Sequence, residues 1–294
     1  PMRRLACLFL LPLAAFAQPS ATMRPDLLAS ADFTWSQSSR EDIARGPATL
    51  GTLGVDQFGF SFSARHPLSE RTSLAYGVAV NNLDFKFSPG LPIPEDLTEL
   101  SLNLGLQHRL DARWSLAAYL RPGFYGELDE GLDSDSLNAP FLAMANFVQS
   151  RELIWSFGLN ANPFSDNPVL PIVGVRWQFA PDWTFSVGFP RTGLTWKLSD
   201  RLSARAAVAF TGGSFRLTRD LGTLAPGIAR LANTYVDFRE VRVGLGAEYN
   251  LTAATSLSFD VGAVTDRKLD YFDKGYRLDG DGGVFFALAL KGNF

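Results

Sequence analysis

The sequence predicts an all-β protein, a transmembrane antiparallel up-and-down β-barrel of about 14 strands, with about 12 as the alternative. Apolar residues make up 46% of the chain, yet they alternate with polar or small residues in many short windows. A period of two gives a strand one apolar face, and a closed barrel leaves no unpaired strand edge in lipid. The connections between windows are alternately short and long, as expected for short periplasmic turns and long extracellular loops.

The expected strands follow one another along the chain with boundaries uncertain by several residues. The clearest windows lie in the first half, such as Phe58, Phe60 and Phe62 alternating with glycine and serine. The expected windows are residues 31–35, 58–64, 74–80, 100–106, 114–124, 141–147, 153–159, 173–179, 183–189, 194–198, 202–210, 241–249, 257–264 and 284–294. The last window presents Phe286, Leu288, Leu290 and Phe294 on a single apolar face.

The short connections resemble one another. Residues 68–74, 110–116 and 198–204 share a leucine, a serine or aspartate and an arginine in the same order. The long connections are polar and are expected at residues 37–53, 88–97, 127–138, 163–168, 214–234 and 267–283, with the short link at Pro190 as the exception. A soluble β-sandwich also alternates, but its turns are not sorted by length, so the sorting favours a membrane barrel.

The amino end has the features of a secretory signal. Arg3 and Arg4 precede an apolar run from Leu5 to Ala15, which ends in the small-residue pattern at residues 15–17. The expected organisation is therefore a cleaved signal at 1–17 and one barrel domain at 18–294. The formal net charge of −3 becomes −5 when the two arginines are removed, which gives no basic face for nucleic acid.

With the signal at 1–17, the repeated turns and the ending 287–294, the chain resembles uncharacterised, porin-like outer-membrane β-barrel families of Gram-negative-type bacteria. The resemblance implies a location in the outer membrane, with lipid around the barrel. It also implies that the barrel-assembly machinery reads the carboxyl end, where Phe286, Leu288, Leu290 and Phe294 would form the assembly signal. It implies no particular solute.

If the apolar face contacts lipid, the other face lines the lumen, and the lumen then carries more basic than acidic side chains. The expected lumen residues are Arg65, Arg109, Arg121, Arg176, Lys197, Arg205, Arg242 and Lys291, together with Asp32, Glu99, Glu248 and Asp260. Charged rings that face a pore set its ion preference, so one interpretation is a lumen that favours anions. The other is a network of paired charges that only compensates buried charge.

Many expected lumen positions are glycine or alanine, for example Gly105, Gly158 and Gly244, and a barrel of this size leaves space inside. Either water or a loop that folds inward fills this space. The longest connection, 214–234, is the candidate for such a loop, with Arg216, Arg219 and Arg230 facing the pore as a constriction. The alternative is an ordinary surface loop.

Chemistry at a catalytic or metal site is not expected. His66 lies in a turn and His108 lies in the apolar phase, so neither is placed for a nucleophilic triad. The acidic stretch 279–282 lacks the glutamate of a calcium loop. The sequence predicts no enzyme, cofactor or metal site. It predicts a passive, porin-like channel for small solutes, for which anions are one preference. The alternative is a structural or surface-interaction barrel with a plugged lumen.

Overall fold

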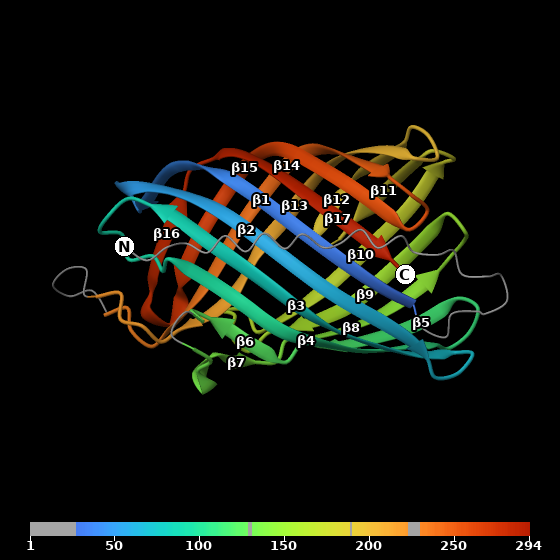
Figure 1. The fold of residues 1–294 in the computed structure, drawn as a ribbon, viewed down its shortest axis with the longest axis horizontal. Coiled ribbons are helices and arrows are strands. Elements are labelled where there is room, and N and C mark those ends of the chain that lie inside the picture. Colours follow the sequence, from blue (N-terminus) through green and yellow to red (C-terminus); the bar gives the residue numbers. More distant parts are fainter. Residues whose placement is uncertain (1–27, 129–130, 189, 223–229) are drawn as a thin grey trace.

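The computed structural model describes residues 28–128, 131–188, 190–222 and 230–294. In these residues the chain forms strand segments that run back and forth around one closed barrel (Figure 1). The first half contains β1 (Leu28–Arg45), β2 (Ala48–Pro67), β3 (Thr72–Phe87), β4 (Asp96–Arg109), β5 (Trp114–Leu120), β6 (Gly123–Gly126), β7 (Leu137–Asn138), β8 (Phe141–Val148) and β9 (Leu153–Ala161). The second half contains β10 (Val169–Ala180), β11 (Trp183–Val187), β12 (Arg191–Lys197), β13 (Leu202–Leu217), β14 (Thr234–Asn250), β15 (Thr255–Tyr271), β16 (Tyr276–Gly280) and β17 (Gly283–Asn293).

These segments make a barrel wall of 14 strands, because three wall strands are each broken into two segments. Pro122 interrupts β5/β6, Pro140 interrupts β7/β8, and a glycine-rich step separates β16 from β17. Proline has no N–H to donate to a strand ladder, which explains the first two breaks. The first and last wall strands pair antiparallel, with Phe33 opposite Leu290, and this pairing closes the barrel. The predicted fold class is confirmed.

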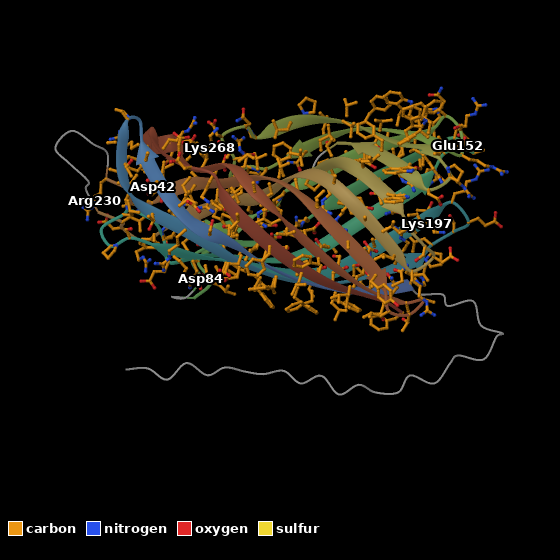
Figure 2. The ribbon with its side chains drawn as sticks, turned by 90° about the horizontal axis from the view of Figure 1, so that it is seen from above. Asp42, Asp84, Glu152, Lys197, Arg230 and Lys268 are labelled. Carbon is orange, nitrogen blue, oxygen red and sulfur yellow. The ribbon has the colours of Figure 1, made fainter. Side chains whose placement is uncertain are left out.

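The half of the barrel near the short turns has the polarity that lipid requires. Phe58, Phe60 and Phe62 on β2 point outward and are about 40% exposed, while Ser61 and Ser63 face inward between them. Figure 2 shows Glu152 and Lys197 at this end of the molecule, which we call the periplasmic end, and Asp42 and Arg230 at the other, outer end. Among the described residues, no helix is long and apolar enough to cross a membrane.

The polarity of the same strands is inverted in the outer half. On β2 the outward series of phenylalanines gives way to Asp56, and the inward series of polar residues gives way to Val55 and Leu53, both fully buried. On β3 the inward residues Leu83 and Phe85 are likewise buried. The strands therefore extend beyond the lipid as a structure with a polar exterior and an apolar interior.

The outer half is also narrower. A ring of nine segments, in the order β13, β14, β15, β16, β1, β2, β3, β4 and β6, is closed by a parallel contact between Arg216 on β13 and Gly126 on β6. The wall strands β8 to β12 take no part in this ring. We call this ring the outer barrel. Its interior is one apolar core made of Ile43, Leu53, Val55, Leu83, Phe85, Leu91, Ile93, Leu97, Tyr125, Phe164, Phe215, Leu217, Leu231, Val236, Phe238, Leu269, Tyr271, Tyr276 and Leu278.

The outer barrel includes parts of three segments that were expected to be loops. Residues 37–53 are mostly the outer ends of β1 and β2, joined by a tight turn in which Gly46 has φ +57°. Residues 267–283 contain the end of β15, a 3-10 turn at Phe272–Lys274 and β16. Residues 214–217 belong to β13. The expected boundaries were wrong because these segments are polar on their outer face, whereas their inward positions keep the apolar alternation.

The loop between β9 and β10 contacts the outer barrel. Phe164, between β9 and β10, packs into the apolar core, and its ring lies 5.1 Å from that of Tyr235. The Ser165 hydroxyl and the Asp166 N–H each donate to Asp237 Oδ2 at 3.1 Å. Burial raises the pKa of Asp237 above its ordinary value, although these hydrogen bonds oppose the rise. Burial in the core also raises the pKa of Tyr271, whose hydroxyl donates to the carbonyl of Pro92.

Candidate functional site

Two adjoining cavities of the lumen below the outer barrel carry most of its charged residues. The first, which we call the inner chamber, has a volume of about 450 Å³. It is lined from β12 to β15, β17, β1 and β2 by polar residues such as Gln57 and Thr211 and by small residues such as Ala207 and Gly244. The second, the mouth cavity, has a volume of about 790 Å³ and lies nearer the periplasmic end, with Ser63, Arg65 and Phe294 in its lining. Pro190 lines both cavities.

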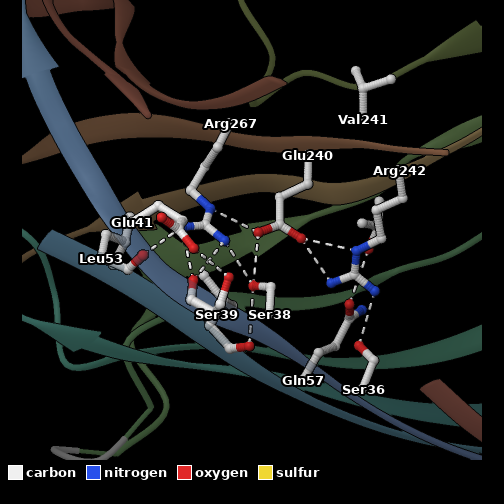
Figure 3. A network of polar contacts seen from close by, with 12 residues as sticks. Ser36, Ser38, Ser39, Glu41, Leu53, Gln57, Glu240, Val241, Arg242 and Arg267 are labelled. Atoms are coloured by element: carbon white, nitrogen blue, oxygen red, sulfur yellow. Dashed lines mark hydrogen bonds and ion pairs between the residues drawn. The ribbon is translucent and has the colours of Figure 1, made fainter. Parts of the chain in front are cut away.

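A buried charge network, drawn in Figure 3, connects Arg242 in the wall of the inner chamber with Leu53 of the apolar core. Glu240 on β14 and Arg267 on β15 are both 0% exposed, and Arg267 Nε donates to Glu240 Oε1 at 2.8 Å. Arg242, two residues further along β14, donates from Nε to the other carboxylate oxygen of Glu240 at 2.9 Å. Two guanidinium groups therefore share one carboxylate.

The rest of the network ties this cluster to β1 and β2. Arg267 Nη2 donates to the Ser38 hydroxyl at 2.8 Å, and its Nη1 donates to the carbonyl of Leu53. Arg242 Nη1 donates to the Ser36 hydroxyl at 3.0 Å, and its guanidinium carbon lies 5.2 Å from the centre of the Phe285 ring. Because these partners come from strands that are far apart in sequence, the network fixes the base of the outer barrel.

A second charge cluster lies in the inner chamber itself. Arg205 on β13 donates from Nε and Nη2 to the two oxygens of Asp260 at 2.7 and 2.5 Å. Glu248 lies 3.6 Å from Arg205 Nη1, and Arg191 Nη2 lies 3.9 Å from Asp260. A Cβ atom at Gly246, between the strands of this pair, would collide with Asp260 Oδ1, so a larger residue there would displace the Asp260 carboxylate from its present position.

A third pair lies on the opposite wall. Glu99 on β4 forms an ion pair with Arg121, which follows β5. Glu99 also accepts from the Ser101 hydroxyl at 2.7 Å and from the Asn81 amide at 3.0 Å. The structure therefore brings together several of the predicted lumen residues, and it pairs most of them: Glu99 with Arg121, and Arg205 with Asp260 and Glu248. Their role in a pore stays a prediction.

The remaining predicted lumen residues lie closer to the periplasmic end. Arg65 lines the mouth cavity, and Arg176 lies opposite Ile154 and Ser186 in the inward phase of β10. Neither side chain forms an ion pair with another described residue. Lys197 is the last residue of β12, and its ammonium contacts Asp200 in the following short turn at 2.7 Å.

The three arginines of the predicted constriction contact acidic partners at the outer end. Arg216 lies on β13, 3.9 Å from Asp135, and its guanidinium covers the ring of Tyr235. Arg219 lies 3.0 Å from Glu127, and Arg230 pairs with Asp220. None of the three lines either cavity. The segment 223–229 is outside the described residues, so the constriction stays a prediction for that part of the chain.

The predicted assembly residues lie on or just after β17. Leu288 and Leu290 are 39% and 44% exposed on the outer face, and Phe294 is 62% exposed. This placement agrees with a lipid-facing strand, and the assembly signal itself stays a prediction. The sequence-based reasoning missed Glu240, Arg267 and Arg191 as lumen residues. The detectable signal for Glu240 is that it shares the inward phase of β14 with Arg242 and Glu248.

Among the described residues, no group of three or more histidine, cysteine, aspartate or glutamate side chains is placed to hold a metal ion. His108 lies on β4 with Nδ1 2.9 Å from the Thr72 hydroxyl.

Comparison with solved structures gives the same fold. The COG4313 outer membrane channel from Pseudomonas putida F1 is 12% identical with a TM-score of 0.50, and the match covers 95% of this chain and 100% of that one. A Pseudomonas aeruginosa FadL homologue is 13% identical with a TM-score of 0.47, covering 92% and 90%. At such identity the first likeness supports the fold alone. No curated protein matches the chain. The family described as Domain of unknown function (DUF6268) matches residues 63–278, well over half of the chain, and the protein therefore belongs to this family.

Proposed function

We propose that the protein is an outer-membrane channel that is held closed toward the outside by its outer barrel and is open toward the periplasm. The fold, which the COG4313 outer membrane channel shares, supports a channel in general. The proposal assigns the chain no enzymatic activity, no cofactor and no nucleic-acid partner. Its ligands would be small solutes that enter the polar lumen.

The observation that carries the proposal is the apolar core of the outer barrel. Ile43, Leu53, Leu97, Leu217 and Leu278 are all 0% exposed, and they come from strands on every side of the ring. A packed apolar interior leaves no path for water or ions. The sequence suggested a passive, porin-like pore; the core instead favours a gated channel, in which solutes pass only when the outer barrel opens.

The charges of the lumen support a preference for anions. The acidic residues Glu99, Glu248 and Asp260 each have an arginine partner, and the fourth acidic lumen residue, Asp32, lies opposite Lys291 in the strand register, so the four offer little free negative charge to a cation. Arg65 and Arg176 face the lumen without such a partner among the described residues. Unpaired charges that face a pore determine its ion preference.

The rival function is a structural or surface-interaction barrel that transports nothing. The polar exterior of the outer barrel favours this alternative, because β14 to β16 expose Arg239, Asp266, Lys268, Arg277 and Asp279 beyond the lipid. A protein of this kind would keep its lumen closed under all conditions. Conductance measurements separate the two functions.

We expect the wild-type barrel, refolded and inserted into a planar bilayer, to show no steady unitary current, because the core blocks the lumen. Ser38 and Val55 lie opposite each other in the β1–β2 hairpin. Replacing residues 39–54 by Asn-Gly would connect these two residues through a two-residue turn. This variant removes Ile43 and Leu53 from the core and should conduct. A two-residue Asn-Gly turn suits a hairpin of this kind.

The matched control replaces residues 44–50 by the same turn. These residues contribute no side chain to the core, so this variant should stay closed. Folding of both variants is checked by heat-modifiable mobility and circular dichroism. A steady current through the wild-type protein would contradict the closed state, and a folded 39–54 variant without current would contradict a channel through this lumen.

The conducting variant also allows a test of ion preference. We expect Arg65→Gln combined with Arg176→Gln to shift its reversal potential in a salt gradient toward cation selectivity, because both removed charges face the lumen unpaired. Arg201→Gln, which changes an exposed arginine in the turn between β12 and β13, is the control. An unchanged reversal potential in the double variant would refute the anion preference.

A further inference from the structure

The ion pairs of the inner chamber and of the network above it contain more guanidinium groups than carboxylates. Four guanidinium groups, Arg191, Arg205, Arg242 and Arg267, share three carboxylates, Glu240, Glu248 and Asp260. Glu41, also drawn in Figure 3, accepts a hydrogen bond from the Ser39 hydroxyl and forms no ion pair with these four arginines. Asp260 accepts two hydrogen bonds from Arg205, so its negative charge mainly compensates the positive charge of Arg205. The excess positive charge therefore remains with Arg242 and Arg191.

Arg242 carries incompletely compensated positive charge at the end of the chamber next to the charge network. Its carboxylate partner Glu240 also binds Arg267, so one negative charge serves two buried guanidinium groups. Arg242 is only 7% exposed, and it lines the inner chamber. An uncompensated buried charge is costly, and an anion brought to it would lower that cost.

Arg191 lies beside Arg242 across one intervening strand. In the strand register Arg191 is opposite Ala209, and Ala209 is opposite Arg242, so the three residues form one row on the inner face. Adjacent strands are separated by about 4.8 Å, which places the two arginine backbones roughly 10 Å apart with only a methyl group between them. The side chain of Arg191 is 49% exposed, and its one ion pair among the described residues is the 3.9 Å contact to Asp260.

The remaining walls of the chamber limit what can occupy it. The small residues Ala207, Gly244 and Ala287 line the same chamber as the two arginines, and Phe285 lies beside Arg242. Ser36, Gln57 and Thr211 add neutral polar groups at the inner end, where the Thr211 hydroxyl is 2.9 Å from Gln57 Oε1. The volume of about 450 Å³ suits a small molecule.

We infer that the inner chamber is a binding site for a small monocarboxylate, whose oxygens accept hydrogen bonds from Arg191 and Arg242 and whose apolar body lies against Ala207, Ala209 and Ala287. Guanidinium groups bind carboxylates through strong charge-assisted hydrogen bonds. This inference rests on the proposed anion-preferring channel and names the solute class and the site. Binding is nevertheless measured without transport, so the two proposals fail separately.

The test is isothermal titration of the refolded full-length barrel in detergent with propionate. Propionamide, which has nearly the same shape without the charge, is the control ligand. We expect propionate to bind and propionamide not to bind. Inorganic phosphate is titrated separately, because a site that accepts any oxyanion would bind it as well as propionate and would overturn the carboxylate assignment.

Two substitutions with opposite charge effects locate the site. Arg191→Gln removes one guanidinium and should weaken propionate binding by about tenfold, which corresponds to ~1.4 kcal/mol. Glu248→Gln removes a negative charge 3.6 Å from Arg205 and should strengthen binding. Loss of packing would weaken binding in both variants, so the opposite signs separate electrostatic recognition from a structural effect.

Arg242→Met and Arg65→Gln complete the set. Arg242→Met leaves Glu240 and Arg267 as a one-to-one pair, so this variant should fold and should no longer bind propionate. Arg65→Gln changes an arginine of the mouth cavity and should leave binding unchanged. Equal weakening by Arg191→Gln and Arg65→Gln, or equal binding of propionamide, would overturn the site. Anion-selective current through the 39–54 variant, together with no propionate binding by the wild-type barrel, would overturn the site and leave the proposed channel intact.

Discussion

Replacing Glu240 by glutamine is expected to lower the free energy of unfolding by ~3–5 kcal/mol, the cost of breaking a buried ion pair by removing one partner. Among the described residues Glu240 is the one carboxylate that contacts both Arg242 and Arg267, and it is 0% exposed. The glutamine amide keeps the shape of the side chain but leaves both guanidinium groups without a counter-charge. Equilibrium unfolding of the refolded barrel in urea measures this loss.

The matched control is Asp84→Asn on the outer face of β3. Asp84 pairs with Lys86, but both side chains are about two-fifths exposed, so the pair should contribute no more than ~1 kcal/mol. A similarly small loss for Glu240→Gln would mean that water reaches the network, and the closed outer barrel would then be wrong. The large loss is expected only if the base of the outer barrel is dry.

Replacing Leu97 by alanine is the second change with a large expected effect, a loss of ~2–5 kcal/mol in the free energy of unfolding. Leu97 on β4 is 0% exposed and lies opposite Leu83 of β3 in the apolar core. Its truncation removes buried methyl groups and leaves a cavity, because the paired strands around it cannot move inward to fill the space. The same urea unfolding experiment measures the effect.

Leu50→Ala is the control for that prediction. Leu50 is also a leucine of the outer barrel, but it lies near the tip of the β1–β2 hairpin and is 42% exposed. Surface substitutions of this kind usually change the free energy of unfolding by less than ~0.5 kcal/mol. Similar losses for Leu97→Ala and Leu50→Ala would mean that the outer barrel is loosely packed, which contradicts its role as a plug.

The barrel, its closure and its lipid face could be predicted from the sequence because they depend on short-range alternation. The series Phe58, Phe60 and Phe62 is visible without any knowledge of neighbouring strands. The pairing of β1 with β17 follows from the requirement that no edge remains in lipid. The predicted strand count was confirmed for the same reason.

The outer barrel was missed because its outward residues are polar, and polar stretches resemble loops. Residues 48–56 keep their alternation, but the apolar members, Leu53 and Val55, have moved to the opposite face. A reading based on the average polarity of a segment does not detect this change of face. The parallel contact between Arg216 and Gly126 is a long-range pairing, and no local pattern reports it.

The candidate site was predicted only in part. Arg205, Arg242, Glu248 and Asp260 were identified from the phase of their strands. Their pairing depends on the register between strands, which the sequence does not encode locally. Arg267 was missed because a bulge between Val241 and Arg242 in the pairing of β14 with β15 shifts the inward phase of β15 beyond that point.

The change of face along each long strand has a consequence for the alignment of neighbouring strands. A slip of one residue turns every side chain of a strand to the other face. In a uniform membrane barrel such a slip places polar groups in lipid. In this protein it would also turn Leu53 and Val55 of β2 toward water and Asp56 toward the apolar core. The alignment of each long hairpin is therefore fixed twice, by the lipid around its periplasmic half and by the water around its outer half. A misaligned hairpin would expose polar groups to lipid and apolar groups to water.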